Sequence, residues 1–190
     1  FIPLVLGWIY PTIFSPIHII FLELIMGPTC SIVYENEPME KNTMSQNPRP
    51  FTNTFFSWKE LSTSIIQGLV ITLGTLFVYQ YSVHLNYNEN IVRTMVFTCL
   101  VTSNIFLTLS NRSFYYSIFT TIQYKNNLIL IITSITIIIT ALLLYVPLLT
   151  NFFNFEHLNK YQIGIAISVG FIVVIWYEIV KIWKRKTIKS

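Results

Sequence analysis

Long apolar segments separated by short polar loops run through the whole chain. Four segments have the length of about 20 residues that a helix needs to cross the hydrocarbon core of a bilayer. They are residues 62–83, 91–110, 128–149 and 161–182. Residues 17–34 make a fifth such run, and residues 1–10 have the pattern of the tail of a sixth. The pattern predicts an all-α membrane protein, a bundle of about six transmembrane helices of which the first is truncated.

Composition supports the membrane assignment. Hydrophobic residues make up 53% of the chain and charged residues 11%, whereas soluble domains carry about 25% charged residues. No repeat or linker divides the sequence, so residues 1–190 are expected to form a single transmembrane domain. The net charge of +4 is spread over loops and one tail without a basic stripe, which argues against a nucleic-acid partner.

The distribution of lysine and arginine predicts the orientation. The loops at residues 35–59 and 111–127, together with the C-terminal tail, hold ten of the 12 basic residues. Only Arg93 and Lys160 fall on the other side. Because loops rich in lysine and arginine stay in the cytoplasm, we expect a multi-pass protein with a cytoplasmic C-terminal tail.

A lone carboxylate, Glu23, lies within the fifth run and is followed one turn later by Gly27-Pro28. An ionisable side chain at bilayer depth costs at least about 2.5 kcal/mol and usually faces a bundle interior or an ion path. Proline removes a backbone donor, which frees a carbonyl oxygen. The combination predicts a helix that is unwound at Gly27-Pro28 and whose polar atoms bind a cation. The alternative is a structural, protonated Glu23 that only donates a hydrogen bond.

Other polar residues have simpler expected roles. Glu178 and Lys181 are spaced to pair at i,i+3 near the membrane surface. His18 is expected to be an interfacial residue rather than a proton relay. The loop carboxylates are expected to form a solvated face, or else a vestibule that attracts cations. They are Glu35, Glu37 and Glu40.

Two stretches carry a family resemblance. FSPIHIIFLELIMGPTCSIVYENEPME (residues 14–40), followed by NPRP (residues 47–50), resembles the sixth transmembrane helix and following loop of P-type cation-transporting ATPases of the calcium-pump branch. VRTMVFTCLVTSNIFLTLSNRS (residues 92–113) is similar to the eighth helix of that family. The resemblance covers nearly the whole chain and implies the six-helix C-terminal block of such a pump.

The resemblance also implies site residues. Glu23 matches a cation-ligand position of the sixth helix, and Asn104 falls where some calcium pumps carry a further ligand. Gly27 replaces the aspartate that the family usually has there, so only its backbone could contribute. The transported cation would be Ca²⁺ or another divalent cation, with one ion per cycle a reasonable stoichiometry. A plain helix-to-helix hydrogen bond is the alternative role for Asn104.

The implied function is the C-terminal membrane part of an ATP-driven cation pump of a bacterial inner membrane. Its partners would be the lipid bilayer and the N-terminal remainder of the pump. That remainder would hold the upstream helices and the actuator, phosphorylation and nucleotide-binding domains. ATP and Mg²⁺ would be the cofactors of those domains in the complete pump. All eight acidic residues are glutamate, so no aspartyl phosphate can form here, and we expect no catalytic or cofactor-binding residue and no activity of these residues alone. The opening on Phe1 within an apolar stretch indicates a fragment boundary. A membrane scaffold or accessory subunit, or a passive ion conduit, are the alternatives.

Overall fold

The computed structural model describes residues 5, 7–37, 58–113, 118 and 126–189, and within them the regular structure is entirely helical. The helices are α2 (Pro16–Glu35), α3 (Trp58–His84), α4 (Glu89–Ser110), α6 (Asn127–Tyr145), the short α7 (Pro147–Phe152) and α8 (Lys160–Lys189). Five of these are long and apolar enough to cross a membrane, all but α7. The predicted class, an all-α membrane protein, and the five complete spans are therefore confirmed.

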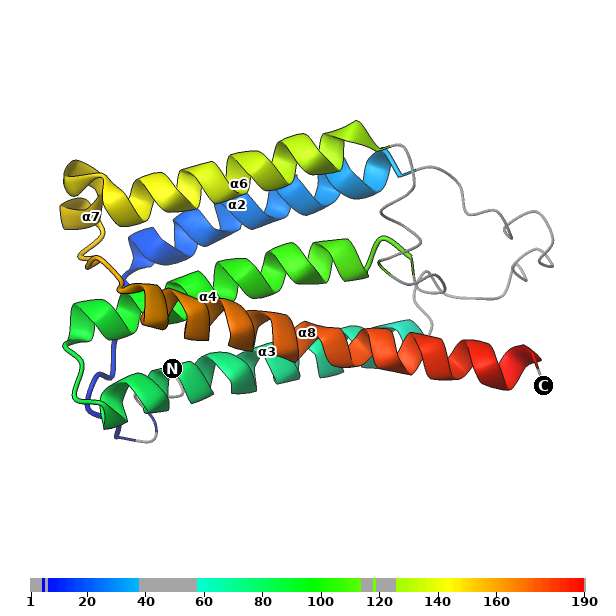
Figure 1. Ribbon diagram of the computed structural model, residues 1–190, viewed down its shortest axis with the longest axis horizontal. Coiled ribbons are helices and arrows are strands. Elements are labelled where there is room, and N and C mark those ends of the chain that lie inside the picture. Colours follow the sequence, from blue (N-terminus) through cyan, green and yellow to red (C-terminus); the bar gives the residue numbers. More distant parts are fainter. Residues whose placement is uncertain (1–4, 6, 38–57, 114–117, 119–125, 190) are drawn as a thin grey trace.

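Helix α4 lies at the centre of the bundle (Figure 1). Of its span, 61% is buried, against 19% to 28% of the other four spans. Helices α3, α4 and α8 pack closely on one another, whereas α2 packs on α6 and touches α4 over fewer residues. The outer surfaces are apolar, with residues such as Leu73 and Ile172 more than 60% exposed, as expected for faces that contact lipid.

The expected unwinding of α2 at Gly27-Pro28 is wrong, because α2 is helical from Pro16 to Glu35. Proline has no N–H, so the carbonyl of Leu24 cannot receive its usual i+4 hydrogen bond. The loss of one bond does not end the helix, since membrane helices tolerate proline where their surroundings compensate the freed group. The backbone oxygen that proline frees therefore belongs to Leu24, one residue after Glu23.

The predicted helices over residues 128–149 and 1–10 also need correction. The run over residues 128–149 is divided, because α6 ends at Tyr145 and α7 begins at Pro147. Val146 between them has extended backbone (φ −85°, ψ 116°), which is what a following proline favours. Of the expected truncated helix over residues 1–10, residues 8–10 are not helical, and most of the rest lies outside the described residues.

The start of the described chain instead packs as a loop on α3. The Trp8 ring stacks on Tyr79 with centroids 4.8 Å apart. The Tyr10 N–H donates to the Tyr79 hydroxyl at 3.0 Å. Gly7 has φ +63°, a left-handed conformation that glycine adopts at little cost. This loop therefore packs against the C-terminal part of α3.

Close contact between α4 and α8 depends on Gly170. A Cβ at this position would lie 3.1 Å from the Cys99 carbonyl oxygen and 3.0 Å from the Thr102 Cβ. We expect Gly170→Leu to lower the free energy of unfolding by about 1–3 kcal/mol, because overpacking forces the two helices apart. Gly164 on the same helix has no such neighbour within 4 Å, so Gly164→Leu is the matched control. Thermal unfolding in detergent measures both variants, and equal losses would contradict the close approach.

Candidate functional site

Glu23 lies near the middle of the α2 span. It is the eighth residue of the helix, which at 1.5 Å per residue places it about 10 Å from the helix start. Its side chain is exposed, as are those of its face neighbours Ile20 and Leu24, at 66% and 67%. Among the residues that the structure describes, none donates a hydrogen bond to Glu23. A carboxylate at mid-membrane depth is thus left uncovered by this part of the chain.

Gly27 lies one turn after Glu23 on the same face of α2. It is exposed, and a Cβ built there would meet no atom within 4 Å. The carbonyl of Leu24 belongs to the turn between Glu23 and Gly27. It receives no i+4 hydrogen bond, because Pro28 has no N–H. This stretch of α2 therefore offers one carboxylate and one backbone oxygen, and the space at the Gly27 Cβ position is open.

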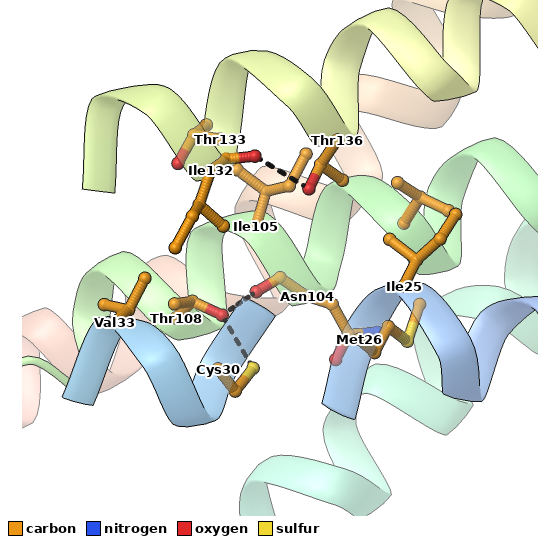
Figure 2. A pocket seen from close by; sticks show the side chains of 11 residues that line it. Ile25, Met26, Cys30, Val33, Asn104, Ile105, Thr108, Ile132, Thr133 and Thr136 are labelled. Carbon is orange, nitrogen blue, oxygen red and sulfur yellow. Dashed lines mark hydrogen bonds between the residues drawn. The ribbon is translucent and has the colours of Figure 1, made fainter. Parts of the chain in front are cut away.

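Asn104 lines a different feature, a small cavity between α2, α4 and α6 (Figure 2). The space open to the centre of a water molecule is about 20 Å³, enough for about one water. The α2 side of this cavity includes Met26 and Cys30, whereas Glu23 is not among its lining residues. The three predicted site residues are thus not brought together: Glu23 and Gly27 share one face of α2, and Asn104 meets α2 elsewhere.

Hydrogen bonds around the cavity hold the helices that line it. The Asn104 Nδ2 donates to the Leu100 carbonyl at 2.9 Å, a bond within α4. The Thr108 hydroxyl donates to the Asn104 carbonyl at 2.8 Å. The same Thr108 Oγ1 lies 3.2 Å from the Cys30 Sγ of α2, as Figure 2 shows. This contact between α2 and α4 was not predicted, because nothing in the sequence pairs Cys30 with Thr108.

A buried ion pair within α8 contacts the end of α4 through Ser110, and its predicted partners are confirmed. The Lys181 Nζ lies 2.7 Å from the Glu178 Oε1, with the two side chains 1% and 7% exposed. The same ammonium donates to the Ser110 carbonyl at 2.5 Å. Glu178 accepts further hydrogen bonds from the Ser110 hydroxyl at 2.8 Å and from the Ile118 N–H at 3.0 Å.

Glu37 corrects the expectation of a solvated carboxylate face. Its carboxylate pairs with Arg112, with the NH2 nitrogen 2.8 Å from Oε1, and the two side chains are only 11% and 2% exposed. Glu35 is exposed, as a solvated face requires, and Glu40 lies outside the described residues. Because Glu37 is paired with Arg112 and largely covered, it does not serve an open vestibule.

At the opposite end of the bundle, near the start of the α2 span, His18 is buried within the protein, with 1% of its surface exposed. The Ser15 N–H donates to its Nδ1 at 3.2 Å, so the ring hydrogen lies on Nε2, which donates to the Phe153 carbonyl at 2.7 Å. Nearby, Arg93 donates to the Ile13 carbonyl at 2.6 Å. These contacts fix the start of α2.

The chain is similar to cation-transporting ATPases. The family model described as "Cation transporting ATPase, C-terminus" matches residues 11–183. A calcium-transporting ATPase type 2C member 1 of Homo sapiens is 25% identical over 172 residues, which are 90% of this chain and 19% of the relative. Calcium-transporting ATPase 1 of Bacillus cereus is 25% identical over an alignment of 201 positions, which covers 97% of this chain and 22% of the relative. The chain thus spans about a fifth of the length of these relatives.

Proposed function

Because this chain belongs to the family of cation-transporting ATPase C-terminal regions, we propose that it contributes part of the cation site and translocation path of an ATP-driven pump. Residues 1–190 would form one transmembrane domain. The N-terminal remainder of the pump would supply the actuator, phosphorylation and nucleotide-binding domains, and the ATP and Mg²⁺ would bind there. The proposed location is a bacterial inner membrane.

The observation that carries this proposal is the uncovered carboxylate of Glu23 in the middle of α2. Leaving it against lipid would cost at least about 2.5 kcal/mol, so further helices of the pump are expected to cover this face. Ca²⁺ takes six to eight oxygen ligands. Glu23 and the Leu24 carbonyl would supply two of them, and the covering helices and water the others.

Calcium is the proposed cargo, because the relatives are named as calcium-transporting ATPases. Gly27 leaves this part of the site with one carboxylate, which supports the transport of one ion per cycle. Asn104 is proposed as a second polar group on the path, through the cavity that it lines beside Met26 and Cys30.

Transport in proteoliposomes tests the proposal against its two rivals. We expect the complete pump to accumulate Ca²⁺ only when ATP is present on the cytoplasmic side. The Glu23→Gln variant should accumulate much less at the same low Ca²⁺ concentration. Equilibration of Ca²⁺ without ATP would indicate a passive conduit, and no Ca²⁺ movement under either condition would indicate a scaffold.

Orientation can be tested by labelling single cysteines with a membrane-impermeant thiol reagent. In a background without other cysteines, we expect Leu85→Cys and Asn151→Cys to react from outside the cell, and Asn36→Cys and Asn127→Cys to react only after the membrane is opened. All four positions are exposed, and the first two avoid Asn86 and Asn154, whose positive φ disfavours cysteine. The reverse pattern would contradict the assignment from basic residues.

Restoring a carboxylate at Gly27 should strengthen Ca²⁺ binding. A side chain there meets no atom within 4 Å, and it would lie one turn from Glu23. We expect Gly27→Asp to lower the Ca²⁺ concentration that half-saturates phosphorylation of the complete pump, because Ca²⁺ affinity rises with ligand charge. Gly27→Asn has the same size without the charge and is the control. An equal effect of both variants would show that charge at this position is not what matters.

A further inference from the structure

Three consecutive residues at the C-terminal end of α4 reach three other helices. Ser110 bonds Lys181 and Glu178 of α8. Asn111 exchanges two amide hydrogen bonds with Gln67 of α3, at 3.1 and 3.2 Å. Arg112 binds Glu37, which lies two residues beyond the last residue of α2. The end of α4 is therefore a common anchor for its neighbours.

The contact to α2 is the most extensive of the three. The Arg112 Nε donates a bifurcated hydrogen bond to both Glu37 oxygens, at 3.0 and 3.1 Å, and hydrogen bonds between charged groups are stronger than those between neutral ones. Asn126, immediately before α6, donates to Glu37 Oε2 at 3.0 Å and to the Val33 carbonyl of α2 at 3.4 Å. We call Glu37, Arg112 and Asn126 the Glu37 clamp. It joins the ends of α2 and α4 to the start of α6.

Helix α2 depends on such end contacts, because only 19% of its span is buried. Between its two ends, a cavity separates it in part from α4 and α6. The polar side-chain contact to α4 is made at Thr108, to which both Cys30 and Tyr34 are hydrogen-bonded. The start of α2 is held by His18 on Phe153. The apolar side of α2 also packs on a buried cluster through Phe21, Leu22 and Met26. This packing and the polar contacts at the two ends together set the rotation of α2 about its own axis, and so the direction in which Glu23 faces.

We propose that the Glu37 clamp positions the cation site: it holds the C-terminal end of α2 and thereby orients Glu23 toward the cation. This inference rests on the proposed function. Arg112 and Glu37 are positioning residues here, since Glu37 lies 14 residues beyond Glu23, about 20 Å along the direction of α2. Loss of the clamp lets α2 rotate and separate from α4, which weakens cation binding without removing a ligand.

Variants of the complete pump test the clamp. We expect Arg112→Met to raise the Ca²⁺ concentration that half-saturates phosphorylation by about three- to thirtyfold. Glu37→Gln keeps an oxygen for Asn126 and should have a smaller effect, and the charge swap Glu37→Arg with Arg112→Glu should restore part of the affinity. Lys181→Met is the matched control, because it removes a buried ion pair at the same end of α4 that holds α8 instead of α2. It should lower thermal stability and leave the Ca²⁺ dependence unchanged.

A second readout needs no cation. With all other cysteines replaced, we expect a small membrane-permeant thiol reagent to label Cys30 faster in Arg112→Met than in the parent or in Lys181→Met. Unchanged Cys30 labelling, or equal shifts in Ca²⁺ dependence for Arg112→Met and Lys181→Met, would overturn the inference. Faster labelling with unchanged Ca²⁺ dependence would overturn it too. In each case the Glu23→Gln variant decides separately whether the proposed function stands, since it alters the ligand and leaves the clamp intact.

Discussion

Glu23→Gln is expected to raise the Ca²⁺ concentration that half-saturates phosphorylation of the complete pump by about 10- to 100-fold, equivalent to about 1.4–2.8 kcal/mol. Glutamine keeps the volume and one oxygen of glutamate but removes the charge. Two opposite unit charges about 4 Å apart attract with about 4 kcal/mol at an effective dielectric constant of 20. The remaining amide oxygen offsets part of that loss. Phosphorylation from ATP over a series of buffered Ca²⁺ concentrations measures the shift.

The control for this prediction is Glu35→Gln. Glu35 is an exposed carboxylate at the C-terminal end of the same helix, where solvent screens its charge. Its replacement should leave the Ca²⁺ dependence unchanged. If Glu23→Gln behaved like Glu35→Gln, Glu23 would be a structural residue, and the main argument for a cation site on α2 would be lost.

Lys181→Met is expected to destabilise the α4–α8 contact by about 3–5 kcal/mol. Removing one partner of a buried ion pair leaves the other charge uncompensated, and this costs more than the pair itself contributes. Here the residual charge is that of Glu178, whose side chain is 7% exposed. The reactivity of Cys99, fully buried in α4, reports the opening of this contact as the pump is heated in detergent. The midpoint temperature at which Cys99 becomes reactive should be lower in Lys181→Met than in the parent.

The double variant Lys181→Met with Glu178→Leu separates charge from packing. Replacing both partners by apolar residues of similar size is often neutral or stabilising. We therefore expect the double variant to recover most of the stability that the single variant loses, although the Ile118 N–H loses its acceptor. Equal losses in the single and double variants would show that the pair acts through packing instead of through its charges.

The spans could be predicted from the sequence because a helix that crosses the hydrocarbon core needs about 20 consecutive apolar residues, and such a run is visible in the local composition. Local rules failed where the outcome depended on context. Gly27-Pro28 removes one hydrogen bond, yet α2 continues through it. Pro147 does divide the run predicted over residues 128–149, because it restricts the residue before it as well as lacking an N–H.

The site was predictable only in part. A charge in an apolar run marks Glu23 whatever the fold, and its i,i+4 spacing from Gly27 places the two on one face of any helix. Asn104 faces Met26 and Cys30 because of the rotation of α2 and α4 about their axes, which hydropathy does not encode. The Glu37–Arg112 pair joins residues 75 positions apart, so no local pattern could separate this paired carboxylate from the exposed carboxylate of Glu35 at the end of α2.

We expect the uncovered carboxylate on α2 to bind the transported cation. Equilibrium binding of radioactive Ca²⁺ to the purified complete pump, without ATP, tests it most directly because no later step of the cycle contributes. We expect about one Ca²⁺ per pump for the parent, in keeping with a single carboxylate on this helix, and loss of that binding at the same free Ca²⁺ concentration for Glu23→Gln. Binding of equal amount and affinity by both proteins would contradict a role of Glu23 as a ligand of the cation.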